Sequence, residues 1–153
     1  AIIGLLSTLA VVSLNNARIK ARDARRQSDL KQIATAMELY YSNNNRYPVN
    51  SGTLGTGACG TAGVVAVTET AGIDRMCATG GITDASQTYL GAIPQDPNTA
   101  NGAYYFEADT SNAGTNYCMY ATLESTANTI FKCTSLGSCA IASSTAACNE
   151  AGI

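Results

Sequence analysis

The sequence predicts an α+β fold, in which one long N-terminal helix packs on a small antiparallel β-sheet within a disulfide-bonded head. Three observations support this prediction. Apolar residues recur at helical spacing over residues 1–45, aromatic and β-branched segments alternate with turn residues over residues 104–133, and the chain of 153 residues contains 6 cysteines. We therefore expect an N-terminal helix over residues 1–45 and one globular head over residues 46–153.

The helix begins with an apolar stem over residues 1–14, which carries no charge and nothing more polar than serine and threonine. As a helix this segment is about 21 Å long, and it falls short of the roughly 20 residues needed to cross a bilayer. The sequence shows no initiator methionine, basic leader or cleavage site at this end. We expect the segment to be the remainder of a longer apolar one.

The second part of the helix, residues 15–45, is basic and amphipathic, and asparagines at 43–45 are suited to end it before Pro48. Four residues share the face that is expected to pack on the sheet: Leu30, Ile33, Met37 and Tyr40. A helix of about 42 residues is roughly 63 Å long, which exceeds the diameter of a head of this size. The uncharged stem therefore has to be covered by lipid or by other subunits, because a large apolar surface is rarely left in water.

Charge is divided between the helix and the head. Six of the 9 Lys and Arg lie within residues 18–31, where two aspartates leave a net charge of +4; the other three basic and nine acidic residues give the rest of the chain −6. An acidic bulk repels phosphate, so nucleic-acid binding is not expected. The basic run is either a solvated helix face or a contact with acidic heads of adjacent subunits, which would relieve its repulsion at i, i+4 spacing. We favour the second, with four residues in the intersubunit contact: Arg18, Arg22, Arg25 and Arg26.

The head is expected to begin with a long irregular connection over residues 46–103, in which Asp84 is the N-cap of a short helix that reaches Tyr89. Three strand candidates follow and predict an antiparallel meander over residues 104–133. Their predicted bounds are Tyr104–Ala108, Tyr117–Leu123 and Asn128–Cys133. Residues 134–153 are rich in Ser and Ala, and we expect a tail that is closed by a disulfide.

The six cysteines form no Cys-x-x-Cys pair, and the sequence contains no histidine, so a zinc site is poorly supported. The residues are Cys59, Cys77, Cys118, Cys133, Cys139 and Cys148. Three disulfides in a small secreted domain fit an oxidising compartment, whereas six reduced cysteines in a cytosolic protein are the alternative.

Pairing the cysteines with their neighbours along the chain gives one of the fifteen connectivities that six cysteines permit. This solution joins Cys118 to Cys133, Cys139 to Cys148 and Cys59 to Cys77. Cysteines that lie directly opposite each other can bridge a hairpin. The first bridge would then set Tyr120 opposite Phe131 and Leu123 opposite Asn128, across a four-residue loop.

The residues predict no catalytic site. Ser28 and Lys31 match a Ser-x-x-Lys pattern, in which a lysine activates a serine nucleophile. The companion motifs of that class are absent, so a solvated helix face explains the pair. Without histidine, acid–base catalysis requires carboxylates, and no tight constellation of them occurs. We expect neither an enzyme nor a bound cofactor.

Oxygen-bearing side chains bracket Gly114, in the loop between two predicted strands, and oxygen ligands are those that calcium prefers. The candidates are Glu107, Asp109, Asn112 and Asn116. An ordinary turn built of Asp, Asn and Gly explains the same residues. The main expectation is therefore that no metal binds, with calcium as the alternative.

Two blocks of sequence resemble the type IV pilins and the major pseudopilins of type II secretion. The first runs from Ala1-Ile2-Ile3-Gly4-Leu5-Leu6 into residues 21–48, ARDARRQSDLKQIATAMELYYSNNNRYP. The second is Tyr89-Leu90, then Ile93-Pro94-Gln95-Asp96-Pro97, then Tyr104-Tyr105. Together they cover about half of the chain, and their order is more specific than either block alone. One departure is Val12, since many type IV pilins have a proline there, so any unwinding of the helix is expected to be short and centred near Gly4.

The resemblance implies a pilin-like fold and a life cycle. Members are made as precursors, cut by a prepilin peptidase, held in the inner membrane of bacteria and extruded by pilus assembly machinery into a helical filament on the cell surface. The family signature starts upstream of Ala1 and includes a glutamate, so the sequence is expected to begin inside the mature helix. Major pseudopilins also carry a calcium site in the general region of the head that contains Glu107.

The resemblance also implies the function, which is that of a structural subunit of an extracellular type IV pilus-like filament that polymerises through its N-terminal helix. A major pseudopilin of a type II secretion system is the first alternative, and a low-copy tip adhesin or monomeric disulfide-bonded binding module is the second. The expected partners are copies of this chain. The residues expected to pack in the filament core are Ala1, Ile2, Ile3, Gly4, Leu5, Leu6, Leu9, Val11, Val12 and Leu14.

Overall fold

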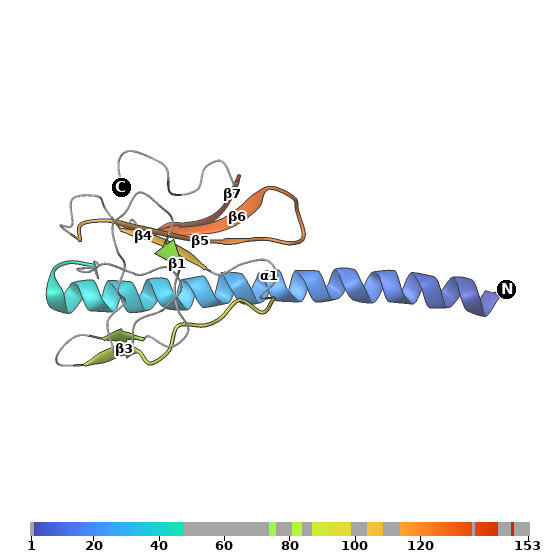
Figure 1. Ribbon diagram of the computed structural model, residues 1–153, viewed down its shortest axis with the longest axis horizontal. Coiled ribbons are helices and arrows are strands. Elements are labelled where there is room, and N and C mark those ends of the chain that lie inside the picture. The colour runs from blue at the N-terminus through green and yellow to red at the C-terminus, as the bar shows by residue number, and fades with distance from the viewer. Residues whose placement is uncertain are drawn as a thin grey trace.

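The computed structural model describes residues 2–47, 74–75, 81–83, 87–98, 104–108, 114–135, 137–143 and 148. Within them, one long helix lies beside a small antiparallel sheet, which confirms the α+β prediction (Figure 1). The helix is α1 (Ile2–Asn44), and its 43 residues make it roughly 65 Å long. It contains no proline and continues through Gly4 and Val12.

The helix ends where the asparagines predict. Asn45 adopts a left-handed conformation with φ 54°, which asparagine tolerates better than most residues. Its N–H donates a hydrogen bond to the carbonyl of Tyr41 at 2.7 Å, so the last turn is closed before the chain turns away. The N-terminal half of α1 projects beyond the head as a free rod, whereas its C-terminal half is enclosed (Figure 1).

Five strands form the main sheet, in the order β1-β4-β5-β6-β7, and β2 pairs with β3 in a separate two-stranded sheet. All described pairs are antiparallel. The strands are β1 (Asp74–Arg75), β2 (Ile82–Thr83), β3 (Thr88–Leu90), β4 (Tyr105–Ala108), β5 (Tyr117–Thr122), β6 (Thr129–Thr134) and β7 (Cys139–Ser143). The three predicted strands are present as β4, β5 and β6.

The described residues differ from the prediction in two regions. Residues 46–103, expected as an irregular connection, contain the short strands β1, β2 and β3. Tyr89 lies in β3, so the expected short helix does not reach it; Asp84, its expected N-cap, lies outside the described residues. The region expected as a tail contains β7, which continues the meander beyond β6.

The core lies between α1 and the main sheet, with the β2–β3 pair covering the other side of the helix (Figure 1). Leu30, Ile33 and Met37 are fully buried there, and Tyr40 packs at the edge against Tyr89. The helical face predicted from these four residues is therefore the one that packs. Side chains of β5 alternate between the two faces of the sheet. One set packs against the helix, and the other set packs in a second cluster on the opposite face.

The hairpin between β5 and β6 has a register one residue away from the predicted one. Met119 lies opposite Cys133. Asn128 adopts φ 57°, and the N–H of Leu123 bonds to the carbonyl of Thr129 at 3.0 Å. Asn128 therefore belongs to the turn instead of the strand, and the extra turn residue moves the pairing by one. The predicted pairs Cys118–Cys133, Tyr120–Phe131 and Leu123–Asn128 are wrong.

This shift decides the disulfides, because a slip of one residue moves a side chain to the opposite face of a sheet. Cys133 faces α1 and bonds to Cys139, which lies directly opposite in β7. Cys118 faces away from α1 and bonds to Cys148. The predicted bridges from Cys118 to Cys133 and from Cys139 to Cys148 are wrong, and the pair Cys59 and Cys77 lies outside the described residues.

Candidate functional site

The apolar stem is described over residues 2–14 of α1, and it forms an exposed rod at the N-terminal end of the helix. Every stem side chain that the structure describes is exposed. The exposed fraction is 81% at Ile3 and 67% at Leu9, and it is still 52% at Leu14. Of the ten residues predicted to pack in a filament core, Ala1 and the side chain of Leu5 lie outside the described part, and the other eight lie on this rod.

The stem is apolar, and no described part of the chain covers it. An apolar surface of this extent marks a contact with another protein or with lipid. Helix α1 is long and apolar enough to cross a membrane by length and composition, and its most apolar window is not buried in the chain. Core helices and signal sequences pass the same test, but the exposed window distinguishes α1 from a core helix. An N-terminal anchor or signal segment accounts for it.

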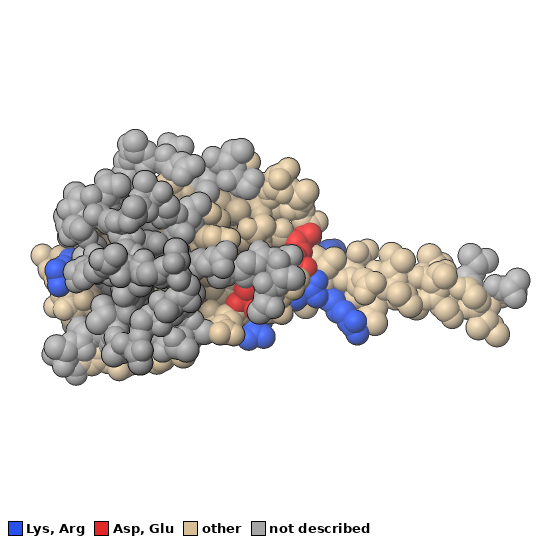
Figure 2. All heavy atoms as spheres, in the orientation of Figure 1, with Lys and Arg blue, Asp and Glu red and all other residues tan. Residues whose placement is uncertain are grey.

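At the base of the stem, five charged side chains from three segments form what we call the junction cluster. Its members are Arg22, Asp23, Arg26, Asp96 and Glu124. The two arginines come from α1, whereas the acids come from α1, from the segment after β3 and from the turn between β5 and β6. Basic and acidic atoms gather at this point, where the rod enters the head (Figure 2).

Arg26 is the centre of the cluster and has no exposed side-chain surface. Its guanidinium donates to Asp23 at 2.7 Å, to both carboxylate oxygens of Asp96 at 2.7 and 2.8 Å, and to Glu124 at 2.5 Å. Hydrogen bonds to these carboxylates raise the pKa of Arg26 further above its ordinary value, so its charge is permanent. Four of its five N–H donors are thus paired with carboxylates, and this pairing offsets the cost of burying the charge.

The carboxylates of the cluster are also held by other donors. Hydrogen bonds from Arg22 and Arg26 lower the pKa of Glu124 to about 2. Burial opposes ionisation of Asp23, but the backbone N–H groups of Glu124 and Ser125 donate to it at 2.9 and 2.8 Å, and the net effect lowers its pKa. The β5–β6 turn is therefore fastened to the helix at the level of Asp23.

This arrangement corrects part of the predicted intersubunit contact. Arg26 is buried within its own head and cannot reach a neighbouring subunit, and Arg22 forms its ion pair with Glu124. Arg25 lies 3.8 Å from Asp29 on the same helix and remains largely exposed, and Arg18 is exposed. Local sequence could not identify the partners, because Asp96 and Glu124 lie 70 and 98 residues from Arg26.

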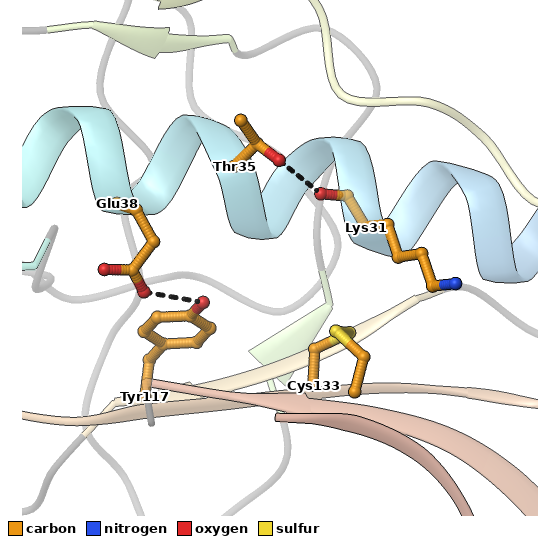
Figure 3. The surroundings of a disulfide bond; sticks show 6 residues. Lys31, Thr35, Glu38, Tyr117 and Cys133 are labelled. Carbon is orange, nitrogen blue, oxygen red and sulfur yellow. Dashed lines mark hydrogen bonds between the residues drawn. A yellow bond between two sulfur atoms is a disulfide. The ribbon is translucent and has the colours of Figure 1, made fainter. Parts of the chain in front are cut away.

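A second polar group lies near the other end of the buried helix face. The hydroxyl of Tyr47 donates to Glu38 at 3.1 Å. The hydroxyl of Tyr117 approaches the same carboxylate at 3.5 Å (Figure 3). Burial, followed by the hydrogen bond to Glu38 and the charge of that carboxylate, raises the pKa of Tyr47 to about 12. The Lys31 side chain extends toward the sheet (Figure 3). Its Nζ lies 5.8 Å from the centroid of the Phe131 ring. In the Ser-x-x-Lys pattern, Lys31 therefore has a structural contact with the sheet, and Ser28 is an exposed residue of α1.

The calcium candidates are only partly described. Glu107 lies in β4 with Cys118 as its partner in β5, and Asn116 accepts a hydrogen bond from Ser135 at 3.2 Å. Asp109 and Asn112 lie outside the described residues. Among the side chains that the structure describes, no group of three His, Cys, Asp or Glu residues is suited to a metal ion. Calcium binding stays a prediction.

The two described disulfides indicate an extracellular or periplasmic location, since such bonds persist in oxidising compartments. No protein-family description, curated protein or solved structure matches this chain.

Proposed function

We propose that this chain is the structural subunit of an extracellular type IV pilus-like filament, which polymerises through its N-terminal helix. The observation that carries the proposal is the stem, a continuous apolar rod that is exposed along its whole described length and rigidly continuous with a helix locked into the head. The sequence resemblance to type IV pilins supports the same function.

Burial of the stem against equivalent stems supplies the driving force. Apolar area removed from water contributes about 25 cal/mol per Å². A rod that projects from one end of the head brings stem against stem while the heads stay outside, so successive subunits can add by the same displacement. Contacts of this repeating kind build an open helical fibre.

The test is assembly of the purified full chain when detergent is diluted, followed by negative-stain electron microscopy. We expect long fibres from the wild type and none from Leu9→Asp, because the carboxylate would be buried between stems. Leu39→Asp is the matched control, since Leu39 is also an exposed leucine of α1, with 53% of its surface accessible, but lies at the level of the head. Wild-type fibre yield from Leu9→Asp would contradict the proposal.

The second candidate is a major pseudopilin, which would form a short periplasmic filament. It is favoured by the block from Tyr89 to Tyr105, whose Asp96 closes the junction cluster. Two measurements separate the candidates. Long surface fibres on wild-type cells at native expression, seen by electron microscopy, support a pilin. Wild-type cells without such fibres, together with a deletion strain that loses protein secretion, support a pseudopilin.

A further inference from the structure

Two exposed cations lie on α1 between the stem and the junction cluster, and they belong to neither. Arg18 and Lys20 are exposed, and within the described part of the chain neither forms an ion pair. Residues 2–22 contain no acidic side chain, and the first one, Asp23, is turned inward onto Arg26 and two backbone amides. We call Arg18 and Lys20 the basic collar.

The spacing of the collar matches the layers of a membrane surface. At 1.5 Å per residue, Arg18 and Lys20 lie about 6 and 9 Å beyond Leu14, the last apolar residue of the stem. The headgroup layer on each side of a bilayer is about 5–7 Å thick. Asn15 and Asn16 lie between Leu14 and Arg18, and their polar amide side chains suit the membrane interface. With Leu14 at the edge of the hydrocarbon, Arg18 lies at the depth of the lipid phosphates, and Lys20 lies about 2 Å beyond the headgroup layer, from where its flexible side chain can reach back to them.

The angular positions of the collar agree with this placement. At 100° per residue, Arg18 and Lys20 point to opposite sides of α1. The two cations therefore lie at nearly the same height on opposite sides of the helix. A headgroup layer that surrounds the helix can contact both of them, whereas a protein packed on one side of the helix can contact only one. The remainder of the chain outside residues 18–31 carries a net charge of −6, from three basic and nine acidic residues. An anionic surface therefore attracts the collar and repels the head.

We propose that the basic collar binds the headgroups of anionic phospholipids, and so fixes the depth of the chain in the membrane before assembly. This inference deepens the proposed function, because it rests on the membrane-held stage of the subunit and names the lipid class that the subunit meets there. Arg22, which pairs with Glu124, and Arg26, which is buried, take no part.

The test measures which lipids surround the full chain in bilayers. The chain is reconstituted in phosphatidylcholine that contains trace spin-labelled phosphatidylglycerol or spin-labelled phosphatidylcholine, and electron spin resonance gives the association of each lipid with the protein. The wild type is expected to prefer phosphatidylglycerol, and the preference should fall with added salt. In Arg18→Gln/Lys20→Gln, the ratio of phosphatidylglycerol association to phosphatidylcholine association should fall by up to about fivefold for each charge removed.

The matched control is Lys31→Gln/Arg46→Gln, which removes one exposed cation in the half of α1 that packs on the sheet and one just after the helix. Lys31 lies about 25 Å beyond Leu14 along the helix, outside the headgroup layer, so the control should keep the wild-type preference. Equal association of both lipids with the wild type, or an equal loss in the control, would overturn the proposal.

The fibre assay separates this inference from the proposed function. Wild-type protein that prefers phosphatidylglycerol but forms no fibres would refute the filament and support the collar. A collar variant that keeps the lipid preference but loses its fibres would assign Arg18 and Lys20 to contacts between subunits, and would overturn the lipid proposal.

Discussion

At the scale of single residues, Arg26 has the largest expected effect on stability. Arg26→Met would leave three carboxylates buried around a methionine, and removing one partner of a buried ion pair costs about 3–5 kcal/mol. Arg25→Met is the control, because Arg25 is its neighbour on α1 but has a side chain that is 63% exposed and a 3.8 Å ion pair; we expect a loss below about 1 kcal/mol. Urea unfolding of both variants measures the difference, and equal losses would contradict the role given to the cluster.

The same cluster predicts how stability depends on pH. The pKa of Glu124 is about 2 in the folded chain, against an ordinary value of 4.5. A carboxylate with a lowered pKa stabilises the fold above its unfolded pKa, and this contribution is lost as the pH falls from 4.5 toward 2. The lowered pKa of Asp23 acts in the same direction. The free energy of unfolding should therefore decrease over that interval.

The control for this pH dependence is Glu124→Gln, which cannot ionise at that position. The variant should be less stable than the wild type at neutral pH, and its free energy of unfolding should fall less steeply between pH 4.5 and 2. Urea titrations at a series of pH values measure both slopes. An unchanged slope in the variant would show that Glu124 does not contribute to the acid sensitivity.

At the scale of elements, periodicity predicts α1 well because its signal is local. The spacing of Leu30, Ile33 and Met37 marks the buried face, and asparagine at position 45 marks the end. The sequence signal of strand β7 is weak. Its sequence Cys-Ala-Ile-Ala-Ser has one β-branched residue, and only Cys139 and Ala142 are partly buried. Its pairing with β6 depends on tertiary context that small residues do not encode.

The disulfides could not be deduced from cysteine spacing, because their pairing depends on a single turn residue. Had Asn128 belonged to β6, Cys118 and Cys133 would face each other on one side of the sheet. With Asn128 in the turn at φ 57°, they lie on opposite faces. Asparagine is depleted in strands and tolerates left-handed turns, but this preference is too weak to fix the register by itself, and packing against α1 decides between the two.

At the scale of the whole molecule, the candidate site divides into a part that sequence predicts and a part that it does not. The stem follows from the composition of residues 1–14 and from the length of the helix. The junction cluster requires residues from three segments to converge, and only the fold brings Asp96 and Glu124 to Arg26. The sequence-based expectation of an intersubunit partner for Arg26 is wrong for this reason, because the acids that pair with it belong to the same head. For Arg22, which pairs with Glu124 but stays partly exposed, it remains a prediction.

The division between stem and head also predicts that the two parts are energetically independent. No described side chain from Ile2 to Arg18 is buried, so a chain that starts at Arg18 should retain the full free energy of unfolding of the head and should sediment as a monomer. A chain that starts at Ser28 would lack Arg22, Asp23 and Arg26, and it should be less stable by several kcal/mol, about as much as Arg26→Met. Urea unfolding and sedimentation velocity compare the two truncations. If the chain that starts at Arg18 unfolds at a markedly lower urea concentration than the full chain, the stem supports the head, and its exposed apolar surface would need an explanation other than assembly.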